Sequence, residues 1–126
     1  MILIVDDDPV FLDDATTLAV EPNRTLVAPG SSTALELIRK LGSDINLVMI
    51  DLSFGSESGF DLIQAIKALD KDLPVIAFSG MASPTALESA MVFGANATLR
   101  KPISQNWIDT IARVRRRSDK QPAPSS

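Results

Sequence analysis

The sequence predicts a doubly wound α/β domain, in which a five-stranded parallel sheet lies between two layers of helices. Short apolar runs alternate along the chain with segments in which apolar residues recur at helical spacing. This alternation is the signature of repeated strand–helix units. Four of the runs also end in polar residues, as expected where parallel strands deliver side chains to one ligand-binding edge of a sheet.

Five apolar runs are expected to form the strands of this sheet, and the third leads directly into Asp51. In flavodoxin-like sheets the strand order is 2-1-3-4-5, which brings the first and third strands together at the centre. With right-handed crossovers, the helices then cover both faces of a three-layer (βα)5 sandwich. The expected strands are Met1–Val5, Arg24–Ala28, Leu47–Ile50, Pro74–Phe78 and Ala97–Leu99.

A helix is expected after each strand. The first begins at Asp8-Pro9, where aspartate caps the helix and proline takes the first helical position, and it ends near Glu21-Pro22. Ser83-Pro84 repeats this start signal, while Gly42 and Gly94 end the second and fourth helices. The stripes expected to face the sheet are Phe11, Ala15 and Leu18; Ala34, Leu37, Ile38 and Leu41; Leu62, Ile63, Ile66 and Leu69; Leu87, Ala90 and Met91; and Ile108, Ile111 and Ala112.

The remaining segments are expected to form a loop between a strand and a helix, the last helix, and the tail that follows it. A small polar loop is predicted between Leu52 and Gly59. The final helix, from about Ser104, ends in the basic run Arg113–Arg117, which we interpret as a solvated helix end because the helix dipole favours cations there. Trp107 is either a core residue or an exposed anchor for a partner. One domain is expected over residues 1–117, followed over 118–126 by a flexible tail or the start of a linker.

The composition limits the chemistry that the chain can perform. Its 126 residues fit one domain, and 45% apolar residues are enough for a continuous core. There is neither cysteine nor histidine, which excludes disulfides, thiolate metal sites and serine–histidine triads. The formal charge of -4 argues against a nucleic-acid-binding protein. No apolar stretch approaches the roughly 20 residues of a membrane helix, and no signal segment precedes the first strand, so we expect a soluble cytoplasmic protein.

Polar residues at four strand ends are expected to build one acidic pocket. Asp6 and Asp7 follow the first strand, Asp51 follows the third, Ser79 the fourth, and Lys101 lies just beyond the fifth. Two carboxylates about 4 Å apart repel by roughly 4 kcal/mol at an effective dielectric near 20, so a cation must relieve them. Since only oxygen ligands are available, the fitting ion is hard and divalent, and Mg2+ is the expected cofactor because it often bridges carboxylates to a phosphate. The neighbouring Asp8 is explained as a helix cap.

This pocket has the groups that phosphoryl transfer needs, because positioning and charge neutralisation supply most of that catalysis. A carboxylate can take a phosphoryl group as an acyl phosphate. Asp51 is the best candidate, because it alone lies where the other polar groups converge. Lys101 can pair with Asp51 or with an incoming phosphoryl oxygen, and Ser79 can donate a hydrogen bond to the same group.

In this order, these residues resemble the receiver domain of two-component response regulators, and the chain looks like a chemotaxis regulator. The resemblance covers Met1 to about Arg117 and includes every strand and helix in sequence. Each motif is weak alone, but together they are highly specific. They are Val5-Asp6-Asp7-Asp8, Asp51 with Gly59 eight residues later, Ser79, and Gly94-Ala95 followed by Lys101-Pro102.

The resemblance implies that Asp51 accepts a phosphoryl group from a histidine kinase or a phosphotransfer protein. It also implies that Asp6 and Asp7 hold Mg2+, with Asp51 and the backbone carbonyl of Ser53 completing the protein ligands. Such a bacterial phosphorelay protein catalyses its own phosphorylation and dephosphorylation but does not turn over external substrates.

Two further residues of the pocket gain roles from the resemblance. Ser79 is expected to be the switch hydroxyl that moves toward the phosphoryl group, and Lys101 its ionic partner. The Lys101-Pro102 bond is expected to be cis. The face formed by the fourth helix, fifth strand and fifth helix is where a downstream protein, an output domain or a second copy is expected to bind. Direct contact with nucleic acid or a membrane is not expected.

The chain differs from the usual pattern of the family at three positions. Thr98 stands at the switch position, three residues before Lys101, where the family has an aromatic residue. A rotating ring therefore cannot report phosphorylation from that position. Gly55 replaces a proline common after the acceptor, and Ile103 replaces a phenylalanine. The loop after Asp51 is expected to be looser in consequence.

Three alternatives remain open from the sequence. A degenerate receiver that acts as a constitutive protein-binding module would be consistent with Thr98, although every pocket residue is retained. A metal-dependent phosphatase with an aspartyl intermediate is disfavoured, because such enzymes resemble a D-x-D-x motif after the first strand, whereas Asp51 follows the third. A flavin or dinucleotide carrier is weaker still, since no G-x-G-x-x-G follows a strand.

Overall fold

The computed structural model describes residues 1–15, 24–54, 57–80 and 84–116. Within these ranges none of the helices has the length and apolar character needed to cross a membrane. The strands are β1 Ile2–Val5, β2 Thr25–Ala28, β3 Leu47–Asp51, β4 Ser53–Phe54, β5 Glu57–Ser58, β6 Val75–Ser79 and β7 Ala97–Arg100. The helices are α1 Pro9–Ala15, α2 Ser31–Leu41, α3 Gly59–Leu69, α4 Pro84–Phe93 and α5 Gln105–Val114, with a short 3-10 turn, η2, at Gly42–Asp44.

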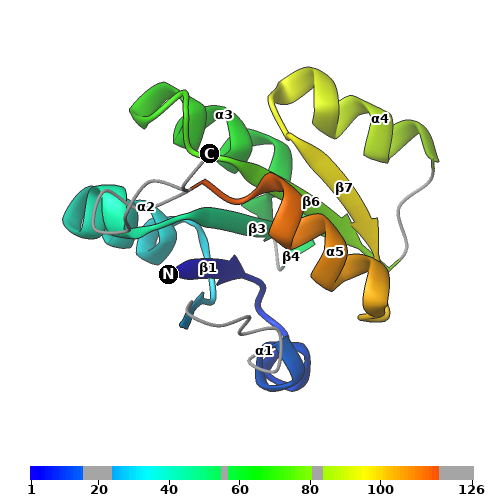
Figure 1. Cartoon of the computed structure of the whole chain (residues 1–126). Coiled ribbons are helices and arrows are strands. Elements are labelled where there is room, and N and C mark those ends of the chain that lie inside the picture. Colours follow the sequence, from blue (N-terminus) through cyan, green and yellow to red (C-terminus); the bar gives the residue numbers. More distant parts are fainter. Residues whose placement is uncertain (16–23, 55–56, 81–83, 117–126) are drawn as a thin grey trace, which may run out of the picture.

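The five-stranded sheet has the order β2-β1-β3-β6-β7, and all its neighbouring strands are parallel. Because β4 and β5 form a separate sheet, β6 and β7 are the fourth and fifth strands of this one. The order is therefore the predicted 2-1-3-4-5 of a flavodoxin-like sheet. Figure 1 shows α2, α3 and α4 on one side of the sheet and α1 and α5 on the other. The predicted doubly wound three-layer fold is therefore confirmed.

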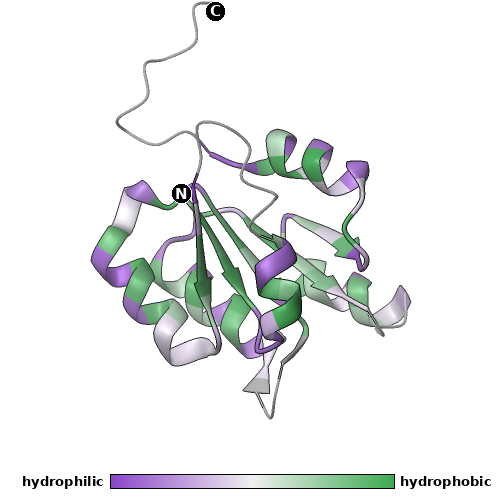
Figure 2. Ribbon diagram, turned by 90° about the horizontal axis from the view of Figure 1, so that it is seen from below, coloured by the Kyte–Doolittle hydropathy of each residue, from purple (hydrophilic) through white to green (hydrophobic). Residues whose placement is uncertain are grey.

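Each face of the sheet has its own core, because successive side chains of a strand point to opposite faces. Leu3 and Val5 of β1 pack with α2, α3 and α4, whereas Ile2 and Ile4 pack with α1 and α5. All four side chains are buried. Burial on both faces explains why the central strands β1, β3 and β6 read as continuous apolar runs, whereas the edge strands β2 and β7 are only partly buried. In Figure 2 the central strands are hydrophobic along most of their length, while the surrounding helices carry hydrophilic residues as well.

Three residues predicted to face the core do not do so. Leu69 is 44% exposed at the last turn of α3, and Met91 is 46% exposed on α4, one position beyond the buried Ala90. Neighbouring residues on a helix point about 100° apart, and Met91 points away from the side on which Ala90 is buried. In α5 the buried residues are Trp107, Thr110 and Ile111, and Ala112 is exposed. Trp107 is thus a core residue.

The polar segment between Leu52 and Gly59 differs from the expected loop, because it contains two short antiparallel strands. Ser53 of β4 pairs with Ser58 of β5, and Phe54 pairs with Glu57. Strands of two residues are too short for any alternation to show in the sequence. The expectations for Leu18, Glu21-Pro22, Ser83 and Arg117 lie outside the described residues, as does Gly55.

The chain beyond α5 returns to the amino-terminal edge of the sheet. There Arg116 forms an ion pair with Asp70, with 2.9 Å between Nη1 and Oδ2. Its Nε donates to the carbonyl of Ile45, and its own carbonyl accepts from Asn46. Partial burial raises the pKa of Asp70, but the hydrogen bond from Arg116 contributes to holding that pKa below its ordinary value. Arg116 therefore makes specific contacts, unlike the purely solvated helix end that was expected.

Candidate functional site

The first and third strands place two carboxylates at the same edge of the sheet. Val5 of β1 lies beside Ile50 of β3, so the next residues, Asp6 and Asp51, leave adjacent strands together. Asp6 is fully buried and Asp51 is 6% exposed, whereas Asp7 is exposed. The structure therefore separates the two expected metal ligands of the first strand, burying Asp6 and leaving Asp7 in contact with solvent.

Lys101 lies between the two buried acids. Its Nζ is 3.0 Å from Oδ2 of Asp6 and 3.4 Å from Oδ2 of Asp51. Burial of the amine lowers the pKa of Lys101, but the hydrogen bond with Asp6 and the charge of Asp51 outweigh burial and hold the pKa above its ordinary value. The Lys101-Pro102 peptide bond is cis, as predicted. Lys101 thus supplies the positive charge that two crowded carboxylates require.

Ser79 reaches the same edge as the last residue of β6. Phe78 pairs with Asp51 across β6 and β3, and Ser79 is one residue further toward that edge. It is 3% exposed, and its carbonyl accepts the backbone N–H of Lys101 at 3.1 Å. Ser53 also lies at this edge, because the N–H of the preceding Leu52 donates to the carbonyl of Phe78.

Thr98 does not lie among the polar residues of this edge. It is a half-buried residue of β7 that pairs with Ala77 of β6. Together with Leu87 of α4 and Trp107 of α5, it lines a separate pocket of about 390 Å³, which we call the Thr98 pocket. The switch position is therefore part of the surface between α4, β7 and α5.

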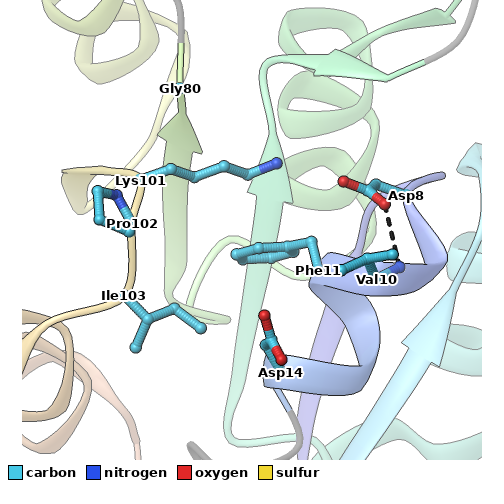
Figure 3. A pocket seen from close by; sticks show the side chains of 8 residues that line it. All are labelled: Asp8, Val10, Phe11, Asp14, Gly80, Lys101, Pro102 and Ile103. Atoms are coloured by element: carbon cyan, nitrogen blue, oxygen red, sulfur yellow. Dashed lines mark hydrogen bonds between the residues drawn. The ribbon is translucent and has the colours of Figure 1, made fainter.

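A larger pocket of about 610 Å³ opens beside Lys101 (Figure 3). Asp8 is on its rim and acts as the predicted helix cap, since its Oδ1 accepts the N–H of Val10 at 3.0 Å. Ile103 lines the pocket where the family commonly has phenylalanine. The full lining is Asp8, Val10, Phe11, Asp14, Gly80, Lys101, Pro102 and Ile103.

The sequence did not predict the aromatic surroundings of Lys101. Its Nζ is 4.2 Å from the centroid of the Phe11 ring and 5.6 Å from that of Phe78, which are distances of a cation–π contact. Phe11 was expected only as a core residue of the first helix, and Phe78 only as the end of a strand. The one signal in the sequence is that Phe78 directly precedes Ser79.

The donor set fits a hard divalent cation. The acidic groups at this edge offer oxygen atoms only, and Mg2+ binds such groups through one or two carboxylates while keeping several waters. Within the described ranges, however, no three acidic side chains converge into a metal-binding group. Lys101 contacts Asp6 and Asp51 in this conformation, so a metal ion bound there would share these two carboxylates with Lys101.

The structure explains why glycine stands at position 59, eight residues after Asp51. A Cβ atom at this position would lie 2.5 Å from the backbone oxygen of Asp51 and 2.7 Å from Cα of Leu52. Real Cβ atoms do not approach backbone atoms so closely, so the first residue of α3 must be glycine. The helix thereby packs directly against the backbone that carries the candidate acceptor.

Gly59→Ala is expected to lower the free energy of unfolding by roughly 2–3 kcal/mol, the upper part of the range for overpacking, because neither contacting group can move without shifting β3. Urea unfolding would measure the loss. Gly80→Ala is the matched control, since its Cβ would meet only the Lys101 side chain at 3.6 and 3.7 Å. Equal stability of the two variants would contradict the close approach.

The family model of the response regulator receiver domain matches residues 2–113. The chain belongs to this family. Receiver domains act in phosphorylation-dependent signalling and interact with histidine kinases or phosphotransfer proteins and with output domains.

Two solved receivers have the same fold. The CheY-like receiver domain protein from Methanospirillum hungatei JF-1 is 25% identical with a TM-score of 0.80, and a receiver domain protein from Clostridium thermocellum is 28% identical with a TM-score of 0.81. Each match covers 89% of this receiver and 90% of the other chain.

Curated relatives extend the similarity to longer proteins. The methanol utilization control regulatory protein MoxX of Paracoccus denitrificans is 35% identical over 107 residues, which cover 79% of this receiver and 46% of MoxX. The two-component response regulator ORR24 of Oryza sativa subsp. indica is 31% identical over 111 residues, which cover 87% of this receiver and 18% of ORR24. The chain thus spans less than half the length of either relative.

Proposed function

We propose that this receiver is a phosphorylation-dependent signalling switch, in which Asp51 accepts a phosphoryl group from a histidine kinase or a phosphotransfer protein. The observation that carries the proposal is the position of Lys101, whose Nζ lies within 3.4 Å of both Asp6 and Asp51. Asp6 follows β1 and is fully buried. Asp51 retains slight exposure, pairs with the lysine, and lies beside the strand that ends in Ser79.

Phosphoryl transfer to Asp51 requires little from the protein beyond holding the reacting groups in position. A carboxylate oxygen of Asp51 attacks the phosphorus, forming an acyl phosphate, while the bond from phosphorus to the donor breaks and the donor keeps the electron pair. With phosphohistidine the leaving group is an imidazole, and with acetyl phosphate it is acetate. Lys101 pairs with the negative oxygens, and Ser79 donates a hydrogen bond to one of them.

Mg2+ is the cofactor of the proposed reaction, as it is for receiver domains in general. Asp6, Asp7, Asp51 and the backbone carbonyl of Ser53 would hold it, which is the ligand set that membership of the receiver family implies. When bound, the ion supplies positive charge that neutralises the phosphoryl oxygens.

Phosphorylation is proposed to change binding at the face formed by α4, β7 and α5. A downstream protein, an output domain or a second copy of the chain would bind there, without direct contact to nucleic acid. We assign residues 1–117 to the receiver and 118–126 to a tail or linker. The substitution at Thr98 favours a second candidate, in which the same face binds a partner constitutively.

Intact-protein mass after incubation with acetyl phosphate tests this function. We expect the mass of one phosphoryl group to be added in the presence of Mg2+ and nothing to be added when the ion is chelated. Because acetyl phosphate needs no docking surface, the result depends on the pocket alone. If no adduct forms and a beryllofluoride mimic also fails to bind, the constitutive binding module is the better description.

A further inference from the structure

Three aromatic side chains from separate elements form one buried group, which we call the aromatic cluster. Phe11 comes from α1, Phe78 from β6 and Trp107 from α5. The ring centroids of Phe11 and Phe78 are 5.0 Å apart, those of Phe78 and Trp107 are 5.3 Å apart, and those of Phe11 and Trp107 are 5.8 Å apart. Each ring thus contacts the other two. Because protein interiors are close-packed, one ring cannot shift without the others adjusting.

One end of the aromatic cluster holds the amine of Lys101. The Nζ atom lies 4.2 Å from the centroid of Phe11 while it pairs with Asp6 and Asp51. Figure 3 shows the lysine side chain extending into the pocket beside the Phe11 ring. The face of an aromatic ring attracts a cation, so the ring and the two carboxylates together fix the position of this amine.

The other end of the aromatic cluster forms part of the Thr98 pocket, which Trp107 lines. The indole Nε1 of Trp107 donates to the carbonyl of Arg100 at 2.8 Å, and Arg100 is the residue before Lys101. The indole is therefore connected to the lysine in two ways, through the neighbouring rings and through the backbone. A change at the lysine has a continuous physical route to the surface between α4, β7 and α5.

We propose that the aromatic cluster transmits a displacement of Lys101 to the Thr98 pocket, with Phe11 as the positioning residue for the lysine. The proposal rests on the proposed function, because phosphorylation of Asp51 provides the displacement. A phosphoryl group brings a charge of nearly -2 and three acceptor oxygens, so it draws the amine away from the Phe11 ring. The rings then repack, and Trp107 moves at the wall of the pocket.

The proposed route has two discrete states, which a coupling element requires. In the state described here, Lys101 contacts Asp6, Asp51 and the Phe11 ring. In the phosphorylated state the lysine contacts the phosphoryl group and the ring loses its cation. No aromatic residue is needed at position 98, because the indole of Trp107 supplies a ring at the same pocket.

Trp107 fluorescence tests the proposal directly, because the chain has one tryptophan and no tyrosine. The full chain is incubated with Mg2+ and acetyl phosphate, and emission and intact mass are measured on the same samples. In the unchanged chain, emission is expected to shift in proportion to the phosphorylated fraction, after subtraction of the effect of Mg2+ alone. In Phe11→Leu, the shift per phosphorylated molecule is expected to fall at least threefold.

Phe60→Leu is the matched control. Phe60 contacts Phe93 with 5.3 Å between ring centroids and packs against the core on the other face of the sheet. Its substitution removes a ring of the same kind and is expected to leave the shift per phosphorylated molecule unchanged. If Phe11→Leu does not fold, Phe11→Met takes its place, since methionine fills a similar volume without an aromatic face.

The outcomes separate this proposal from the function on which it rests. An adduct in the unchanged chain without any emission shift would overturn the transmission while leaving Asp51 as the acceptor. A shift of the same size in Phe11→Leu, or in Phe11→Met, would overturn the role of Phe11. The absence of an adduct in the unchanged chain would remove the proposed function itself, and the transmission with it.

Discussion

Asp51→Asn is expected to add no phosphoryl group under conditions in which the unchanged chain adds one. An amide oxygen is a poor nucleophile, and an amide cannot form the acyl phosphate by the same displacement. The shape of the side chain is kept, and Lys101 retains its ion pair with Asp6 at 3.0 Å. The substitution also removes one of two like charges beside the same amine, so the free energy of unfolding should change by less than about 1 kcal/mol. Intact mass and urea unfolding measure the two quantities.

Asp109→Asn provides the control for the loss of one negative charge. Asp109 is exposed on α5, where it accepts a hydrogen bond from Gln105, and its substitution should leave the adduct at full yield. An adduct on Asp51→Asn at the rate of the unchanged chain would show that another carboxylate is the acceptor. Because Asp7 is the exposed acid of the first strand, it would be the next residue to replace.

The centre of the sheet could be predicted from the sequence because β1, β3 and β6 are buried on both faces and therefore stand out as apolar runs. The proximity of Asp6 and Asp51 followed from the strand order, which places β1 beside β3. Which side of each helix faces the sheet was harder to predict. Trp107 and Ile108 both have helical spacing with Ile111. In the structure Trp107 is buried against Phe78, and Ile108 is partly buried against the same core.

The surroundings of Lys101 could not be predicted in the same way. Phe11 and Lys101 are ninety positions apart, and their contact depends on how α1 packs against the end of β7. Periodicity assigned Phe11 to the buried side of a helix but gives no information about which side chain it meets there. Similarly, the spacing of Gly59 from Asp51 was visible as a motif, whereas its cause, a close approach of two backbones, is apparent only in three dimensions.

Lys101→Met is expected to make the stability of the receiver depend strongly on Mg2+. The side chains of Asp6 and Asp51 are only 1% and 8% exposed, and the substitution leaves both without their cation. Breaking a buried ion pair costs roughly 3–5 kcal/mol, and we expect about 3 kcal/mol because the lysine side chain itself is 23% exposed. Methionine keeps most of the apolar length of the side chain, so packing against Phe11 is largely retained.

Added Mg2+ should recover most of this loss. A ligand at a hundred times its dissociation constant stabilises the folded state by about 2.7 kcal/mol if the unfolded chain binds none, and the variant should bind the ion more tightly because no amine competes for the carboxylates. Urea unfolding with Mg2+ and with a chelator measures both effects, and Lys71→Met removes the same charge from an exposed position as the control. If Mg2+ stabilised both variants equally, Lys101 and the metal would not share the same carboxylates, and the metal ligands would have to be sought away from Asp6 and Asp51.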